Sequence, residues 1–306
     1  MSKWPLSAAP EQHLVQVRLV PADADEGVES AAQPVGGRQG RVGPQGVDLV
    51  ADPLPALGRD GGQQAVLARE VPVRRSPAHA CPRAHAARVA EDPRALHALV
   101  NNAGVQVNAS VEALPMDQWR RVFEVNLFGH IAVTQALLPA LLRSKGRVIN
   151  ISSVGGKVAM ATYGAYAGAK FALEAVSDSL RREVAPLGVQ VVVVEPGGVR
   201  TEMAARGIAT ANDLAARMAP EHDERYGRLV QANNTFMASG TASGLTADAA
   251  ARVIAKTVTT RRPRTRYTIG RDAALVTRLV RMLSDRTLDR VLAANLRRHY
   301  PKRAAA

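Results

Sequence analysis

The fold of this chain is decided by the stretch Arg147-Val148-Ile149-Asn150-Ile151-Ser152-Ser153. Its branched apolar residues predict a short buried strand, and the two serines predict a loop where the strand ends. Two comparable runs lie on either side of it along the chain, Leu99-Val100-Asn101-Asn102-Ala103-Gly104 and Val189-Gln190-Val191-Val192-Val193-Val194-Glu195. Helical patterns separate these runs, and a last strand is expected at Arg266-Tyr267-Thr268-Ile269. The alternation predicts an α/β fold with a doubly wound parallel sheet.

Tyr166 and Lys170 are the residues most suggestive of chemistry. They stand four positions apart in a helical stretch, so their side chains share one face. A lysine ammonium beside a phenol favours the phenolate and lowers the phenol pKa from its ordinary value of roughly 10. The spacing alone is weak support, since 5 Tyr and 6 Lys in 306 residues give about 0.1 such pairs by chance. The pair predicts a proton-transferring group if its surroundings agree.

The sequence around this pair, over residues 95 to 202, supports a proton-transferring role. In order along the chain stand an Asn-Asn-Ala-Gly turn, an asparagine in the next helix, a serine after a strand, the Tyr-x-x-x-Lys pair and a Pro-Gly bend. With these motifs the chain resembles the short-chain dehydrogenase/reductase family. The resemblance implies a single Rossmann-like domain, an NAD or NADP cofactor and hydride transfer between an alcohol and a ketone.

The resemblance also implies catalytic roles for four residues. Tyr166 would exchange a proton with the substrate oxygen, and Ser153 would hold that oxygen in place. Lys170 would lower the Tyr166 pKa and bind the nicotinamide ribose, and Asn126 would hold a water that relays protons through Lys170. Structural roles stay open for three of these residues. Ser153 could be a loop serine that caps the next helix, a role that Ser152 could equally fill. Lys170 could be a solvated helix lysine, and Asn126 could be a hydrogen-bonded core amide.

The cofactor-binding residues that the resemblance implies follow the ends of the expected strands. Gly104 would allow the backbone close to the adenosine ribose, and Asn101 would pin the neighbouring strand. Groups near Val199 and Thr201 would meet the nicotinamide carboxamide. The full set is Asn101, Ala103, Gly104, Tyr166, Lys170, Pro196, Gly197, Val199 and Thr201. The histidines, among them His130, show no metal-ligand spacing, so no metal is expected.

Residues 1 to 90 depart from the family pattern. They contain no Ile, Phe, Tyr or Asn and hold 10 of the 18 prolines. The family's glycine-rich loop, which cradles a pyrophosphate, has no complete match here. One candidate for this loop is 22–29, which follows the strand-like run 14–20. It would match one of the motif's three glycines and would place carboxylates in the loop. The other candidate, 35–42, matches two of the three glycines but follows no strand-like run. Either this region is a diverged cofactor half that folds, with strands near 47–52 and 65–68, or a frame error or wrong start has altered it.

Composition sets the remaining expectations. The single Cys81 excludes an intrachain disulfide, and with no signal-peptide pattern a cytoplasmic location is expected. No apolar stretch is judged long enough to span a membrane. Of the net charge of +13, +11 falls from Lys256 onward, where 14 Lys and Arg stand against 3 Asp and Glu.

The basic residues accompany leucines at helical spacing in the tail, 271–306, so a basic amphipathic helical pair is expected there. We expect it to pack on the domain, with weak membrane-surface contact as an alternative and no nucleic acid partner, because aromatic residues are scarce in it.

The expected organisation is therefore an atypical region at 1–90, a Rossmann-like catalytic region at 91–270 and the tail. Residues 201–245 lack a clear period, which predicts an irregular substrate-covering loop for a lipophilic substrate. The phrase at 262–273 resembles the retinol, hydroxysteroid and hydroxybutyrate dehydrogenase branch, and a homo-oligomer is expected. Two other functions stay open: an inactive family member deficient in cofactor binding, and a peripheral membrane protein.

Overall fold

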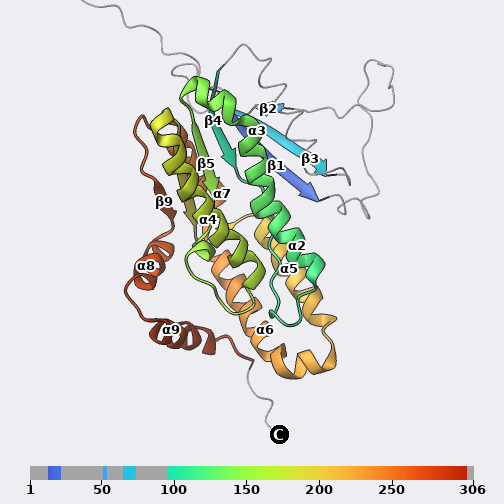
Figure 1. The fold of residues 1–306 in the computed structure, drawn as a ribbon. Coiled ribbons are helices and arrows are strands. Elements are labelled where there is room, and N and C mark those ends of the chain that lie inside the picture. The colour runs from blue at the N-terminus through green and yellow to red at the C-terminus, as the bar shows by residue number, and fades with distance from the viewer. Residues whose placement is uncertain (1–12, 22–50, 54–64, 74–94, 302–306) are drawn as a thin grey trace, which may run out of the picture.

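A computed structural model describes residues 13–21, 51–53, 65–73 and 95–301. Its main sheet has seven strands in the order β2-β3-β1-β4-β5-β6-β9 (Figure 1). The strands are β1 (His13–Pro21), β2 (Ala51–Pro53), β3 (Ala65–Val73), β4 (Leu96–Asn101), β5 (Arg147–Ile151), β6 (Gln190–Pro196) and β9 (Arg266–Ile269). Every neighbouring pair is parallel except β2 with β3. The predicted doubly wound α/β sheet is therefore confirmed.

The strand order changes direction between β1 and β4, since β3 follows on one side and β5 on the other. In such sheets ligands bind outside the carboxyl ends of the strands at this point. The three strands expected in the first 90 residues overlap β1, β2 and β3. Both candidate glycine loops, at 22–29 and 35–42, lie outside the described residues.

Helices follow most strands, as parallel pairing requires. They are α2 (Met116–Phe123), the π-helix η2 (Glu124–Phe128), α3 (Gly129–Ser144), the 3₁₀ turns η3 (Val154–Gly156) and η4 (Ala185–Leu187), α4 (Gly164–Val184), α5 (Glu202–Ala216), α6 (Pro220–Ala242), α7 (Ala247–Thr259), α8 (Arg271–Val280) and α9 (Asp285–Arg297). A small parallel pair, β7 (Val199–Arg200) with β8 (Leu245–Thr246), lies apart from the main sheet.

The core has two layers because successive strand residues point to opposite faces of the sheet. On one face Leu99, Val148 and Val191 are in register and pack with Leu137 and Leu141 of α3. The next residue of each strand faces the other way and packs against α7. Figure 1 shows α3 and α4 in front of the sheet and α7 behind it. Both faces are covered, so the strands read as continuous apolar runs.

Residues 201–245 form two helices, so the expected irregular loop is wrong. Thr201 caps α5 by accepting a hydrogen bond from the Ala204 amide, and Pro220 occupies the first position of α6. The two helices pack against each other below the sheet (Figure 1). Their many small residues weaken the amphipathic period that would have identified them in the sequence.

The continuous helical stretch Met116–Ser144 is long and apolar enough to cross a membrane by length and composition. The sequence alone had predicted no segment long enough to span a membrane. Half of its most apolar window is buried, and α3 packs on β4 and β5 through Val133, Leu137 and Leu141. A core helix that covers a sheet meets the same criterion.

Candidate active site

Ser153 follows β5 directly and begins the turn η3. Its Oγ accepts a hydrogen bond of 3.0 Å from the Gly155 amide, so it caps this turn, the role that the sequence left open. The Ser153 side chain also lies beside the Tyr166 phenol and lowers its pKa. A Cβ added at Gly155 would lie 3.2 Å from Cε1 of the Tyr166 ring, so glycine leaves the room that this approach needs.

Tyr166 and Lys170 lie one turn apart on α4, with exposed fractions of 5% and 4%. The Lys170 Nζ lies 5.9 Å from the centroid of the Tyr166 ring and donates a hydrogen bond of 2.8 Å to the carbonyl oxygen of Ile151 in β5. Together with Ser153, these side chains form one buried cluster at the carboxyl end of β5.

The electrostatics of this cluster differ from the expectation. Burial raises the pKa of the Tyr166 phenol above its ordinary value, and the hydrogen bond from Ser153 opposes that rise. Burial lowers the pKa of Lys170 to about 8, because a desolvated ammonium is costly, while the Glu174 carboxylate raises it. Burial therefore sets the direction of the Tyr166 pKa shift, which is opposite to the lowering that the sequence predicted.

Among the described residues, the Asn126 side chain hydrogen-bonds to Val105 and not to Lys170. Its Oδ1 accepts from the Val105 amide and its Nδ2 donates to the Val105 carbonyl, both at 2.8 Å. It is fully buried in the π-helical turn η2, a local geometry that is frequent at functional sites. The residue fixes the chain after the Asn-Asn-Ala-Gly turn to the helix that covers the sheet.

The turn after β4 is tied into the core by side chains on several elements. Asn101 donates to Thr134 at 2.9 Å and to Asn150 of β5 at 2.8 Å, which pins the two strands together. His130 Nε2 donates to the Ala103 carbonyl at 2.8 Å. A Cβ at Gly104 would lie 3.3 Å from the sulfur of Met203, so α5 lies against this turn.

The bend after β6 is shaped by its glycine and its threonine. A Cβ at Gly197, which follows Pro196, would lie 2.9 Å from the Cβ of Ala273 in α8. Val199 begins β7. The Thr201 Oγ1 accepts from Ala204 at 3.3 Å, so its hydroxyl hydrogen stays available to another acceptor.

Three residues near the cluster were not predicted from the sequence to belong to the site. Tyr163 stacks edge-on against Tyr166 with ring centroids 5.7 Å apart, and burial raises its pKa. Glu174 continues the face of Tyr166 and Lys170 at the same four-residue spacing, a signal that was present in the sequence. His130, which the sequence excluded as a metal ligand, is a buried core residue, and burial lowers its pKa to about 3.

The free donors of the cluster match a sugar diol. Within the described residues, the Lys170 ammonium makes one hydrogen bond, to Ile151, and an ammonium has three donors. The phenol of Tyr166 lies on the same face of α4. A ribose that presents two hydroxyls at the carboxyl end of β5 fits this donor set.

Comparisons with known proteins identify the family to which the chain belongs. The sequence model of the short chain dehydrogenase family matches residues 56–212. Mouse retinol dehydrogenase 5 is 40% identical over 205 residues, 64% of either chain. The NADPH-dependent 3-dehydrocapnine reductase of Ornithobacterium rhinotracheale is 31% identical over 210 residues, which are 67% of this chain and 72% of that protein.

A solved structure shares the fold. A short-chain dehydrogenase from Streptomyces avermitilis superposes with a TM-score of 0.53 and 27% identity, over 74% of this chain and 77% of the other. The chain spans about three fifths of the length of the retinol dehydrogenases that it matches, 64% for the mouse protein and 58% for human retinol dehydrogenase 5. The family model covers half of the sequence and the core motifs, and the chain belongs to the short chain dehydrogenase family.

Proposed function

We propose that the chain is an NAD- or NADP-dependent oxidoreductase that interconverts a secondary alcohol and a ketone on a lipophilic substrate. The observation that carries this proposal is the buried cluster of Ser153, Tyr166 and Lys170 at the carboxyl end of β5. The name of the 31% identical reductase, NADPH-dependent, supports a nicotinamide cofactor.

In this proposal the chain's own residues manage one proton. A bound nicotinamide would supply or accept the hydride. In reduction, the Tyr166 hydroxyl gives its proton to the carbonyl oxygen of the substrate; in oxidation, the phenolate takes the proton from the alcohol. Ser153 lies beside the Tyr166 phenol and lowers its pKa, so it is placed to orient an oxygen bound there. Lys170 would hold the ribose of a bound cofactor and would supply the cation that offsets negative charge on the phenol.

The surroundings of Tyr166 favour an apolar substrate. Met160 and Met237 pack against the cluster of Tyr163, Tyr166 and Ala167. Methionine side chains adapt to irregular apolar shapes, which suits a flexible or bulky hydrocarbon skeleton. The similarity to retinol dehydrogenases is in keeping with such a substrate.

A direct test is an assay of the purified full chain with NADH or NADPH and a panel of ketones of increasing apolar size. We expect absorbance at 340 nm to fall in the presence of a ketone, and turnover to improve with apolar size. A chain that responds to neither cofactor with any ketone, and whose thermal unfolding neither cofactor shifts, would be the inactive family member instead.

The tail gives a specific reason to test membrane contact as well. Leu275, Met282 and Val291 are exposed on or between α8 and α9, Met282 by 82%, beside arginines of the same helices. Exposed apolar side chains with basic neighbours are typical of helices that bind anionic lipid surfaces. Co-sedimentation with anionic vesicles, with and without residues 271–306, decides this point. Retention of the tailless chain on vesicles to the same extent would contradict it.

We also propose a homo-oligomer. Phe128 of η2 and Phe171 of α4 are 52% and 44% exposed, and these two elements contact each other. Large exposed apolar side chains on neighbouring helices are a common feature of subunit interfaces. Light scattering coupled to size exclusion should give a mass above 32.5 kDa, and a Phe171→Glu change should lower it.

A further inference from the structure

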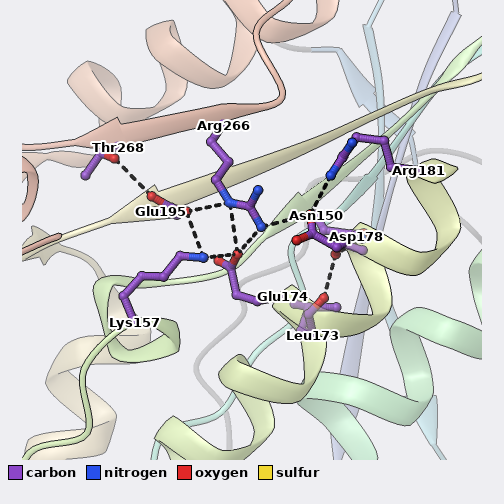
Figure 2. A network of polar contacts seen from close by, with 10 residues as sticks. Asn150, Lys157, Leu173, Glu174, Asp178, Arg181, Glu195, Arg266 and Thr268 are labelled. Atoms are coloured by element: carbon purple, nitrogen blue, oxygen red, sulfur yellow. Dashed lines mark hydrogen bonds and ion pairs between the residues drawn. The ribbon is translucent and has the colours of Figure 1, made fainter. Parts of the chain in front are cut away.

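Glu174 lies one turn beyond Lys170 on α4 and is one of two buried carboxylates in an ion-pair network (Figure 2). Its side chain is 7% exposed, and its Oε2 receives two cations. The Lys157 Nζ lies at 2.6 Å and the Arg266 Nη2 at 3.0 Å. These partners come from the segment after η3 and from β9, so Glu174 joins three separate parts of the fold.

Glu195 at the end of β6 shares the same two cations. Its Oε1 lies 3.4 Å from Lys157 and 3.2 Å from Arg266, and Thr268 donates to its Oε2 at 3.0 Å. The four ions Lys157, Arg266, Glu174 and Glu195 therefore carry no net charge. Figure 2 also shows Asp178, one turn further along α4, which accepts from Arg266 at 2.9 Å on the more exposed side of the network.

The network lies directly behind the active site. The segment that carries Lys157 begins at Ser153, and Gly156 between them packs on the turn of α4 that holds Lys170 and Glu174. A Cβ at Gly156 would lie 3.1 Å from the Lys170 carbonyl, 3.1 Å from Glu174 Cγ and 2.7 Å from Ser152 Oγ. The Lys157–Glu174 pair thus holds the serine loop against the helix of Tyr166.

The groups that act on the Lys170 charge come from several elements. Tyr166 and Glu174 share its face of α4, and His130 approaches from α3. The Ile151 carbonyl of β5 accepts its hydrogen bond. Burial keeps His130 neutral because its pKa falls to about 3. Among the described residues, Glu174 is the carboxylate that opposes the effect of burial on Lys170.

We propose that Glu174 is a positioning residue of the reaction: it holds Lys170 in the charged form and, through Lys157 and Arg266, fixes the Ser153 loop and β9 against the Tyr166 helix. This role rests on the proposed oxidoreductase function. A structural ion pair alone would stabilise the fold but would leave the protonation of Lys170 unchanged.

The test compares Glu174→Gln with Asp178→Asn. Both variants remove one carboxylate that contacts Arg266, but Glu174 alone of the two acts on Lys170. The chain is labelled with ¹³C-lysine and titrated by NMR without cofactor, and Lys170→Met identifies the Lys170 signal among the 6 lysines. We expect Glu174→Gln to lower the Lys170 pKa by about one unit, and Asp178→Asn to leave it in place.

The rate profile provides the second measurement. The loss of activity at high pH, where Lys170 deprotonates, should begin about one pH unit lower in Glu174→Gln than in the wild type, and Glu174→Asp should restore much of the difference. The NMR titration needs no turnover, so an inactive wild type would reject the proposed function while the titration still decides the effect of Glu174 on Lys170.

A double variant serves as the control in case Glu174→Gln alone fails to fold. Glu174→Gln with Arg266→Gln leaves Lys157 and Glu195 as a neutral pair, and it is compared with Arg266→Gln alone. The Lys170 titration is therefore compared with and without Glu174 both in the wild-type background and in the Arg266→Gln background. The proposal would be overturned if Lys170 titrates in the same way with and without Glu174 in either background and if Glu174→Gln and Asp178→Asn lose equal stability.

Discussion

Asn126 and the backbone of Val105 hold each other through two hydrogen bonds of 2.8 Å, with both amide atoms of the side chain in use. The fully buried amide is therefore satisfied by the chain itself, and it anchors the segment after β4.

Replacement of Asn126 by Ala should destabilise the protein. The change leaves the amide and carbonyl of the half-buried Val105 without their side-chain partner, and each unsatisfied buried group costs about 1 to 3 kcal/mol. Urea denaturation should show a loss of about 2 to 5 kcal/mol in the free energy of unfolding. A loss below about 0.5 kcal/mol, the range of ordinary surface changes, would mean that the anchor is unimportant.

Tyr166→Phe should reduce turnover to less than about a tenth of the wild-type rate, with the melting temperature nearly unchanged, because only the transferable proton is lost. Tyr163→Phe is the matched control. Tyr163 lies beside Tyr166 and is also buried, but its hydroxyl is held by Gln106 and Met237. If Tyr163→Phe proves the more damaging change, the acid/base has been assigned to the wrong tyrosine.

Lys170→Met should lower activity and weaken cofactor binding, yet it should not destabilise the fold at pH 7. Burial lowers the Lys170 pKa from 10.5 to about 8, so the unfolded chain binds this proton more tightly than the folded one. At pH 7 the buried ammonium therefore opposes folding by on the order of 3 kcal/mol. Between pH 8 and 10.5 this cost disappears in the wild type, so the stability difference between variant and wild type should shrink. Urea denaturation at pH 7 and pH 10 measures it.

His130→Gln should make the protein less sensitive to acid. Glutamine keeps a donor for the Ala103 carbonyl but does not titrate in this range. Burial lowers the His130 pKa from 6.5 to about 3, so the unfolded chain takes up the proton first and stability is lost as pH falls through this window. At pH 4.5 the wild type should have lost about 2 to 3 kcal/mol more than the variant, relative to pH 7. Parallel stability curves would show that His130 does not cause the acid sensitivity.

Elements defined by local pattern could be predicted from the sequence alone. The branched runs at β4, β5, β6 and β9 identified these strands to within a few residues, because a strand buried on both faces needs consecutive apolar residues. The Tyr166 and Lys170 spacing placed both side chains on one helical face, since helix geometry is fixed over a single turn. Helices α5 and α6 could not be predicted from the sequence, because they are stabilised by packing on each other and lack a strong amphipathic period of their own.

The electrostatics of the site were decided by the tertiary structure. The sequence predicted that Lys170 would lower the Tyr166 pKa, but burial of the phenol in the folded chain raises it. The Asn126 anchor depends on a contact across 21 residues, and the Glu174–Arg266 pair spans 92. Spacing along the chain determines which side chains share a helical turn. Burial and long-range ion pairs instead depend on which distant segments pack against those side chains in the folded protein.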